Sequence, residues 1–189
     1  MRIFFGIPLP EVYQQMLGQA RNEWKKRFRS RLSWTRPGNW HITLRFLGEV
    51  QDDLLPQVKA CLDRVEFDDF CLQGSKSGYF GGAGQYRVAW LGVDGEVQKL
   101  MNLARTLEKE LEGFGFEPEE RPFKAHLTLA RIKNFVASDP WKDFSDYVEN
   151  MGWPQFNVER VNLWQSRLTP AGPEYSVLAY KTLYRSESA

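Results

Sequence analysis

The chain has little that could support a disulfide framework or a cysteine-rich metal site. It contains two cysteines and two histidines in 189 residues. Cys61 and Cys71 are too few for the several bridges of a small secreted domain, and they cannot supply the four ligands of a structural zinc ion. Because 42% of the residues are hydrophobic, a chain of this length can instead be stabilised by an ordinary buried core.

A strong charge and a long apolar segment are also missing. The net charge is +1, whereas proteins that contact many phosphates of a nucleic acid are usually clearly basic. Any contact with nucleic acid should therefore involve an end or a few nucleotides. No apolar run approaches the roughly 20 residues of a membrane helix, and the apolar start is broken by Pro8 and Pro10 without a cleavage pattern. We expect a cytoplasmic protein that has no membrane partner.

Hydrophobic periodicity predicts an α+β fold, with one domain spanning residues 1–189. The pattern of the first helix, which should begin near Pro10, is an apolar stripe with a spacing of four: Val12, Met16, Ala20, Trp24 and Phe28. Further helices are expected at residues 53–65, 97–111 and 139–151. Strands are expected at residues 2–7, 40–47, 70–79, 86–93, 124–131, 158–165 and 175–183, with turns at 81–84 and 169–172. Interleaved helices and strands indicate an α+β architecture.

One segment of the chain is echoed 85 residues later. Residues 36–44 and 121–129 share the pattern R-P-x-x-x-H-[IL]-T-L, and both histidines of the protein lie in it. Two matching segments that are separated by nearly half the chain indicate two similar halves that face each other.

The repeated motif places an imidazole and a hydroxyl on one face of a strand. Residues i and i+2 of a strand point to the same side, so His41 lies beside Thr43 and His126 beside Thr128. Imidazole has a reference pKa of about 6.5, so one ring can accept a proton while the other donates one. In-line displacement at phosphorus needs both roles, and threonine hydroxyls can hold the non-bridging oxygens. The pair of motifs therefore predicts a phosphodiester-cleaving site.

Two other interpretations of the motif fit the sequence less well. A single histidine on a half-buried strand is most often a structural polar residue, but a repeated His-x-Thr pair favours catalysis. A metal site is disfavoured because each motif offers one good ligand, no HExxH helix is present and no carboxylate lies next to either motif. We expect no metal and no cofactor.

Both motifs resemble the signature of the 2H phosphoesterase superfamily, and their surroundings resemble its RNA 2′,3′-cyclic phosphodiesterases, also called 2′-5′ RNA ligases. The first strand at residues 3–7, the Phe-Leu-Gly-Glu tail after the first motif at 46–49 and the blocks at 121–123 and 163–175 are similar to that family. The resemblance therefore covers nearly the whole chain.

The resemblance implies a bilobal fold of two mainly antiparallel sheets with pseudo-twofold symmetry, helices packed outside and an active site in the central cleft. It implies an enzyme independent of ATP and metal that opens 2′,3′-cyclic phosphate ends of RNA or nucleotides to 2′-phosphates, with 2′-5′ ligation as the reverse reaction. His41 and His126 match the catalytic histidines, and Thr43 and Thr128 match the phosphate-holding threonines. We expect a monomer.

The arginine that binds the phosphate has two candidates. Arg131 matches a phosphate-binding arginine of the family, but it lies five residues after His126 and reaches the cleft only if the strand ends or bulges near Ala130. By strand face alone, Arg45 is the better candidate. Phe46 either stacks on a base or packs in the core.

Several points stay open at this level. The substrate could instead be a 2′-5′ oligoadenylate or a cyclic ADP-ribose phosphate, or the chain could bind RNA ends without turnover. The cluster Lys25, Lys26, Arg27, Arg29, Arg31 and Arg36 fits either a guide for an RNA backbone or a solvated helix end. The two motifs are nearly equivalent, so the acid and the base are not distinguished, although we favour His41 as the acid and His126 as the base.

Overall fold

Strands dominate the structure, a computed structural model that describes residues 1–82, 84–170 and 172–182. Nine strands lie in these ranges: β1 Arg2–Pro8, β2 Arg31–Trp34, β3 His41–Glu49, β4 Phe70–Gly82, β5 Gln85–Gly95, β6 His126–Asn134, β7 Gln155–Val158, β8 Arg160–Thr169 and β9 Gly172–Thr182. The helices are α1 Glu11–Trp24, a 3-10 turn η1 Asp52–Leu54, α2 Leu55–Arg64, α3 Val97–Glu112 and α4 Trp141–Glu149.

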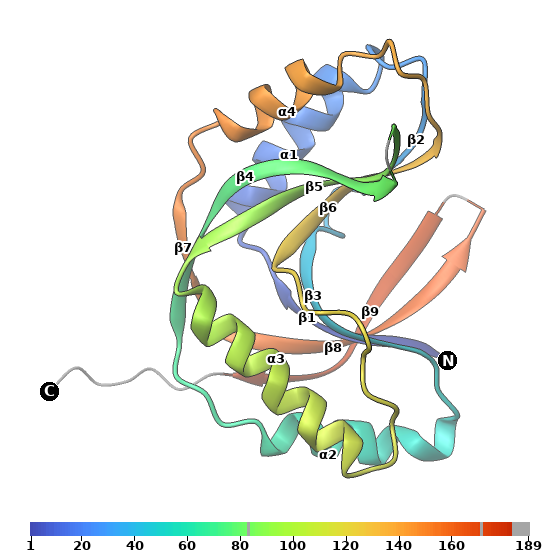
Figure 1. The fold of residues 1–189 in the computed structure, drawn as a ribbon. Coiled ribbons are helices and arrows are strands. Elements are labelled where there is room, and N and C mark those ends of the chain that lie inside the picture. Colours follow the sequence, from blue (N-terminus) through green and yellow to red (C-terminus); the bar gives the residue numbers. More distant parts are fainter. Residues whose placement is uncertain (83, 171, 183–189) are drawn as a thin grey trace, which may run out of the picture.

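The strands form two antiparallel lobes that meet at one residue pair. Strands β7-β4-β5-β6, with β2 on β6, make the first lobe, and β3-β1-β8-β9 make the second. Between β3 and β6 the registered pair is Ile42 with Leu127, and each of these residues directly follows a histidine. The two motifs therefore approach each other across a near-symmetric junction (Figure 1). This arrangement confirms the predicted bilobal, mainly antiparallel α+β fold, and the Ile42–Leu127 pair joins the two predicted sheets into one nine-stranded sheet.

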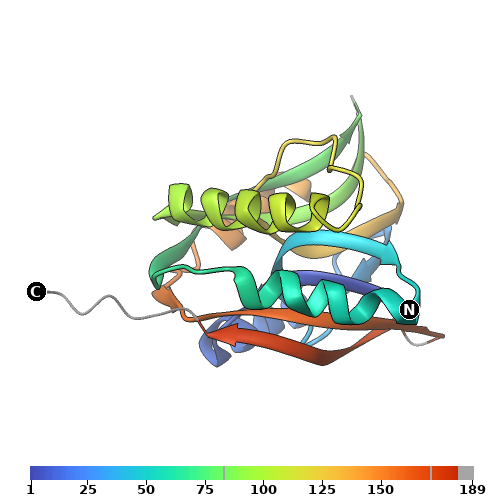
Figure 2. The same ribbon diagram turned by 90° about the horizontal axis from the view of Figure 1, so that it is seen from below.

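The two halves of the chain repeat one succession of elements and exchange their helices. The order β1-α1-β3-α2 matches β5-α3-β6-α4, apart from the insertion of β2. Helix α1 follows a strand of the second lobe but packs with α4 on the first lobe, where Trp24 contacts Phe144 at 5.4 Å between ring centroids. Helix α3 follows a strand of the first lobe but lies with α2 against the second lobe (Figures 1 and 2).

The core residues of α1 differ from the predicted stripe. The buried residues are Tyr13, Leu17, Ala20 and Trp24, whereas Val12 is 43% exposed and the helix ends before Phe28. A strict spacing of four drifts around a helix of 3.6 residues per turn, and the observed spacing of 4, 3 and 4 stays on one side. The buried Tyr13 hydroxyl donates to the Pro154 carbonyl at 2.6 Å and accepts from the Gly74 amide at 2.7 Å, which fixes α1 to β4.

Most other predicted elements are present with shifted ends. The strand predicted at 124–131 begins at residue 126 and runs to 134, and the helix predicted at 53–65 begins with a 3-10 turn. Residue 183, the end of the last predicted strand, and residues 83 and 171 of the two predicted turns lie outside the described part. Strands β2 and β7 were not predicted, because four residues are too few for a clear alternation. Within the described residues, no helix is both long and apolar enough to cross a bilayer.

Candidate active site

His41 and His126 are each the first residue of a strand, and the same contact fixes both rings. The Nδ1 atoms lie 2.7 Å from the carbonyl oxygens of Asn39 and Lys124, two residues earlier in the chain. Because a carbonyl only accepts, Nδ1 carries the hydrogen in each ring. In the neutral rings Nε2 is then the unprotonated nitrogen, which can take up a proton.

The threonines of the motifs lie where the i, i+2 spacing puts them. Thr43 Oγ1 is 3.0 Å from His41 Nε2, and with the hydrogen on Nδ1 the hydroxyl donates to the neutral ring. Thr128 lines the same cavity as Thr43, and its carbonyl accepts a hydrogen bond of 2.8 Å from the Thr35 hydroxyl. Both threonines therefore present polar groups to one space.

A cavity of about 330 Å³ lies between the lobes. It is lined by five of the predicted residues: His41, Thr43, Phe46, Thr128 and Arg131. The remaining lining residues come from β1, β2, β6 and the β8–β9 hairpin and their loops: Arg2, Phe4, Ser33, Trp34, Thr35, Arg36, Asn39, Lys133, Ser166, Leu168, Gly172, Pro173 and Tyr175. Arg36 is the member of the predicted basic cluster that reaches this cavity.

His126 flanks this cavity and is not among its lining residues. Its ring stands edge-on to Phe80, with 5.0 Å between ring centroids, and Lys124 Nζ lies 5.2 Å from the centre of the same phenyl ring. His126 is nevertheless close enough to His41 to affect its protonation electrostatically. The two histidines are therefore neighbours across the junction of the lobes.

Burial governs the protonation of both histidines. Burial away from solvent lowers the pKa of His41 to about 4. The hydrogen bond to the Asn39 carbonyl opposes this decrease, and the charge of His126 adds to it. Burial also lowers the pKa of His126. The hydrogen bond to the Lys124 carbonyl opposes this decrease, and the charges of Arg131 and Lys124 add to it. Both rings therefore favour the neutral form in the free protein, and an anion bound between them would raise both pKa values.

Bulges in the two motif strands decide which later residues reach the cavity. On β3, Thr43 pairs with Gly6 and Arg45 with Phe5, so Leu44 is an extra residue. On β6, Thr128 and Ala130 pair with consecutive residues of β5, so Leu129 is the extra residue. Each bulge lies three residues after its histidine and reverses the strand face beyond it. The fifth residue after each histidine therefore faces the cavity: Phe46 on one strand and Arg131 on the other.

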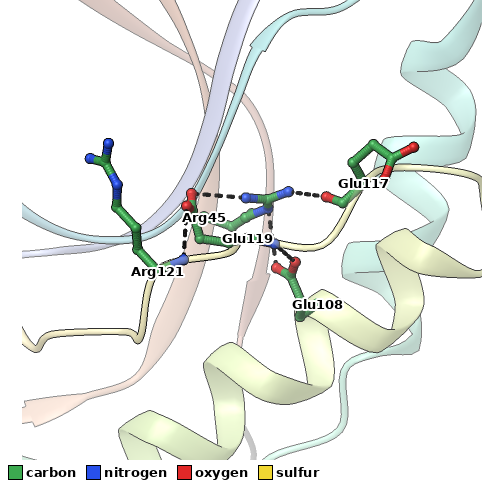
Figure 3. A network of polar contacts seen from close by, with 5 residues as sticks. All are labelled: Arg45, Glu108, Glu117, Glu119 and Arg121. Carbon is green, nitrogen blue, oxygen red and sulfur yellow. Dashed lines mark hydrogen bonds and ion pairs between the residues drawn. The ribbon is translucent and has the colours of Figure 1, made fainter.

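The same bulge carries Arg45 away from the cavity, so the structure does not place this second candidate with the histidines. Its guanidinium forms ion pairs of 3.1 Å with Glu108 and with Glu119 and donates to the Glu117 carbonyl (Figure 3). Glu119 also accepts from the Arg121 backbone amide. Arg45 thus anchors the loop between α3 and β6, the loop that leads to His126.

Sequence reasoning missed the rings that enclose His41. Phe4, Trp164 and Tyr175 lie with ring centroids 4.8, 5.3 and 5.4 Å from that of His41. The close approach of β1 to the first motif depends on Gly6, since a Cβ there would clash with the Ile42 carbonyl oxygen at 2.6 Å and would touch His41 Cδ2 at 3.4 Å. The sequence did indicate that residues 2, 4 and 6 share one face of the first strand. It did not indicate which strands pair with this one, so the face could not be assigned to the site.

Arg2 is a second cation that the sequence did not single out. Its guanidinium carbon lies 5.1 Å from the centre of the Phe46 ring. Burial raises the pKa of the Tyr175 hydroxyl, and the charges of Arg131 and Arg2 both oppose that rise, which locates both arginines near this hydroxyl. Among the described residues, no group of three or more histidine, cysteine or acidic side chains is placed to hold a metal ion.

Comparison with known proteins agrees with this two-lobed geometry. A sequence model of the LigT-like phosphoesterases matches residues 7–90 and again residues 91–175, one match for each half. The chain belongs to the LigT-like phosphoesterases. This family is part of the 2H superfamily, as the paired motifs indicated.

Relatives of this LigT-like chain match it over nearly its full length. An RNA 2′,3′-cyclic phosphodiesterase of Thermotoga maritima is 33% identical over 182 residues, which cover 94% of this chain and 93% of the relative. A crystal structure of a Thermus thermophilus protein has a TM-score of 0.83 at 30% identity and covers 99% and 100% of the two chains. The structure of E. coli LigT complexed with 3′-AMP has a TM-score of 0.76 at 25% identity and covers 97% and 98%.

Proposed function

We propose that this protein is an RNA 2′,3′-cyclic phosphodiesterase that opens 2′,3′-cyclic phosphate ends to 2′-phosphates. The observation that carries the proposal is the pair of equivalent His-x-Thr motifs at the junction of the lobes, each with its imidazole held through Nδ1. The names of the curated relatives agree with this activity.

In the proposed reaction, water attacks the phosphorus and the bond from phosphorus to O3′ breaks, which leaves the phosphate on O2′. One histidine takes a proton from the water at Nε2, and the other gives a proton to O3′. The hydroxyls of Thr43 and Thr128 and the guanidinium of Arg131 hold the non-bridging oxygens, where negative charge increases in the transition state. The chain supplies the proton donor, the proton acceptor and the cation from its own side chains.

We propose His41 as the acid and His126 as the base. With a pKa of about 4 in the free protein, His41 becomes an acid at neutral pH only when the anionic substrate raises that value. An aryl phosphodiester such as bis(p-nitrophenyl) phosphate tests the roles, because its leaving group needs no proton. A His41→Ala variant should lose much less activity on this ester than on a cyclic nucleotide, and His126→Ala should lose activity on both. The opposite pattern would reverse the two roles.

Phe46 is the proposed stacking surface for the terminal base. This residue is 41% exposed, which is unusual for a phenylalanine on a strand, and its ring borders the cavity beside Phe4, with 6.3 Å between ring centroids. Base-to-aromatic stacking contributes about 1–3 kcal/mol per base and tolerates any sequence.

The activity is tested directly with a purified protein, EDTA and no ATP. A 2′,3′-cyclic nucleotide or an oligonucleotide with a 2′,3′-cyclic end should yield a 2′-phosphate, and His41→Ala and His126→Ala should each abolish this product while retaining the far-UV circular dichroism of the parent. A 3′-phosphate product, or full activity in either variant, would overturn the mechanism. A parallel panel with a 2′-5′ oligoadenylate and a cyclic ADP-ribose phosphate separates the substrate classes, and the 2′-5′ ligation product is sought in the same reactions.

The remaining expectations are also proposals. We infer a single domain over residues 1–189, a monomer in solution and a cytoplasmic location. Sedimentation or size-exclusion measurements test the oligomeric state.

A further inference from the structure

The charge of the cavity is very different from that of the whole chain. Although the net charge of the protein is +1, the lining includes the four cations Arg2, Arg36, Arg131 and Lys133 and no aspartate or glutamate. None of these four side chains forms an ion pair with a carboxylate in the described part of the structure. The cavity therefore concentrates positive potential that is not neutralised internally.

Three of the cations come from β6 and from the loop that follows β2. Arg131 and Lys133 are two residues apart on β6 beyond the bulge, so they share the cavity face and are separated by about 7 Å along the strand. Ser33 of β2 pairs with Arg131. Arg36 approaches the β8–β9 turn, where a Cβ on Gly172 would lie 3.3 Å from its Nε. We call Arg36, Arg131 and Lys133 the basic group.

Much of the remaining lining of the cavity is aromatic and apolar. It is formed by residues of β1, β3 and the β8–β9 hairpin: Phe4, Phe46, Leu168, Pro173 and Tyr175. Cations suited to phosphates and rings suited to bases in one cavity together match a nucleotide chain rather than an isolated anion.

The basic group has more cations than one cyclic phosphate can use. The scissile phosphate lies between the motifs in the proposed function, where Thr43, Thr128 and Arg131 are available to it. Lys133 lies about 7 Å beyond Arg131 along β6, and Arg36 lies against Gly172 at the β8–β9 turn, so neither cation belongs to a motif strand position beside the threonines and both are available to a second anion. In a terminal nucleotide with a 2′,3′-cyclic phosphate, the only other phosphate is the one on O5′.

We propose that Lys133 and Arg36 form a subsite for the phosphate on O5′ of the terminal nucleotide, so that the enzyme favours chains over mononucleosides. This inference rests on the proposed function and adds a substrate feature to it. The subsite reads the backbone and not the base, because lysine and arginine contact phosphate oxygens without regard to sequence.

The experiment compares adenosine 2′,3′-cyclic phosphate with the same compound that carries a 5′-phosphate. The second substrate adds one phosphate and no second base. In the parent protein kcat/KM should be about tenfold higher for the 5′-phosphorylated substrate, since one charge-assisted contact contributes about 1.4 kcal/mol or more. In Lys133→Gln and in Arg36→Gln the ratio of the two kcat/KM values should fall to about threefold or less.

Lys109→Gln is the matched control, because Lys109 is an exposed lysine on α3 outside the cavity lining. It removes the same charge from the protein and should keep the parent ratio. Equal kcat/KM for the two substrates in the parent would overturn the subsite, and so would an unchanged ratio in both Lys133→Gln and Arg36→Gln. Turnover of the unphosphorylated cyclic nucleotide is read in the same assay, so failure of the subsite is distinguishable from failure of the proposed function.

Discussion

Substitution of Gly6 by alanine should damage catalysis out of proportion to the size of a methyl group. Gly6 lies in the middle strand of its lobe, where it pairs with Thr43 on one side and with Asn162 on the other. An added Cβ would lie 2.6 Å from the Ile42 carbonyl oxygen and 3.0 Å from Trp164 Cζ3. Contacts below about 3.0 Å between such atoms do not persist, so β3 or the indole has to move.

The size of the effect follows from what has to move. Overpacking of a well-packed site typically costs about 1–3 kcal/mol of unfolding free energy. Ile42 adjoins His41, and the same Cβ would contact the imidazole at 3.4 Å, so relief of the clash displaces the motif. A misplacement of about 1 Å can lower a rate by about 10²-fold. We expect a loss of that order in kcat for Gly6→Ala, with a smaller change in KM.

Thermal unfolding and steady-state kinetics on a 2′,3′-cyclic nucleotide measure the two effects. Gly18→Ala is the matched control, because a Cβ at that position of α1 would have no neighbour within 4 Å apart from the adjacent backbone of its own helix. It should stabilise the protein by about 0.5–1 kcal/mol, as expected for alanine in place of glycine within a helix, and leave kcat unchanged. If Gly6→Ala retained both the Tm and the kcat of the parent, the close packing of His41 against β1 would not position the ring.

Three further predictions concern the other site residues. Arg45→Met should lower the unfolding free energy by about 1–3 kcal/mol, because Glu108 loses its ion pair, whereas Arg131→Met should lower kcat/KM by about 10²-fold or more at an unchanged Tm. Equal losses of activity would contradict the assigned strand faces. Thr43→Val should lower kcat/KM by about 10–10²-fold, with recovery in Thr43→Ser. The bell-shaped pH profile of kcat/KM reports the free enzyme and should be centred below about 6.5. Burial lowers the pKa of the base, which must be neutral to act, and also the pKa of the acid, which must be charged. A centre above about 7 would contradict this sign.

The motif geometry could be predicted from the sequence because it depends on local periodicity. His41 and Thr43 share a face through the i, i+2 rule, which holds for any regular strand. The rule fails at the bulges, and neither Leu44 nor Leu129 differs in type from an ordinary strand residue. Beyond the bulge, the residues that the i, i+2 rule assigns to the cavity face point to the other face of the strand. For this reason Arg45 was expected in the cleft and instead binds Glu108.

Residues brought in by long-range pairing could not be assigned to the site in advance. Tyr175 reaches His41 through the β8–β9 hairpin and the pairing of β8 with β1, none of which is encoded near the motif. Arg2 lies on a strand that was predicted, and Lys133 lies just beyond the predicted end of another. Whether either side chain lines the cavity depends on which strands border it. Local patterns indicate which residues can react, and tertiary pairing decides what surrounds them.

The exchange of helices between the lobes has a consequence for how the chain folds. Strand β1 needs β8 as its second neighbour, and residues 3 and 165 are paired. During synthesis the lobe that carries His41 therefore stays incomplete until most of the chain has emerged, whereas α1 waits for β4 and α4. Each lobe is covered by one helix from each half of the chain, so neither half can bury its apolar face alone. The catalytic pair therefore depends on strands and helices from both halves of the chain, and not on either motif segment alone.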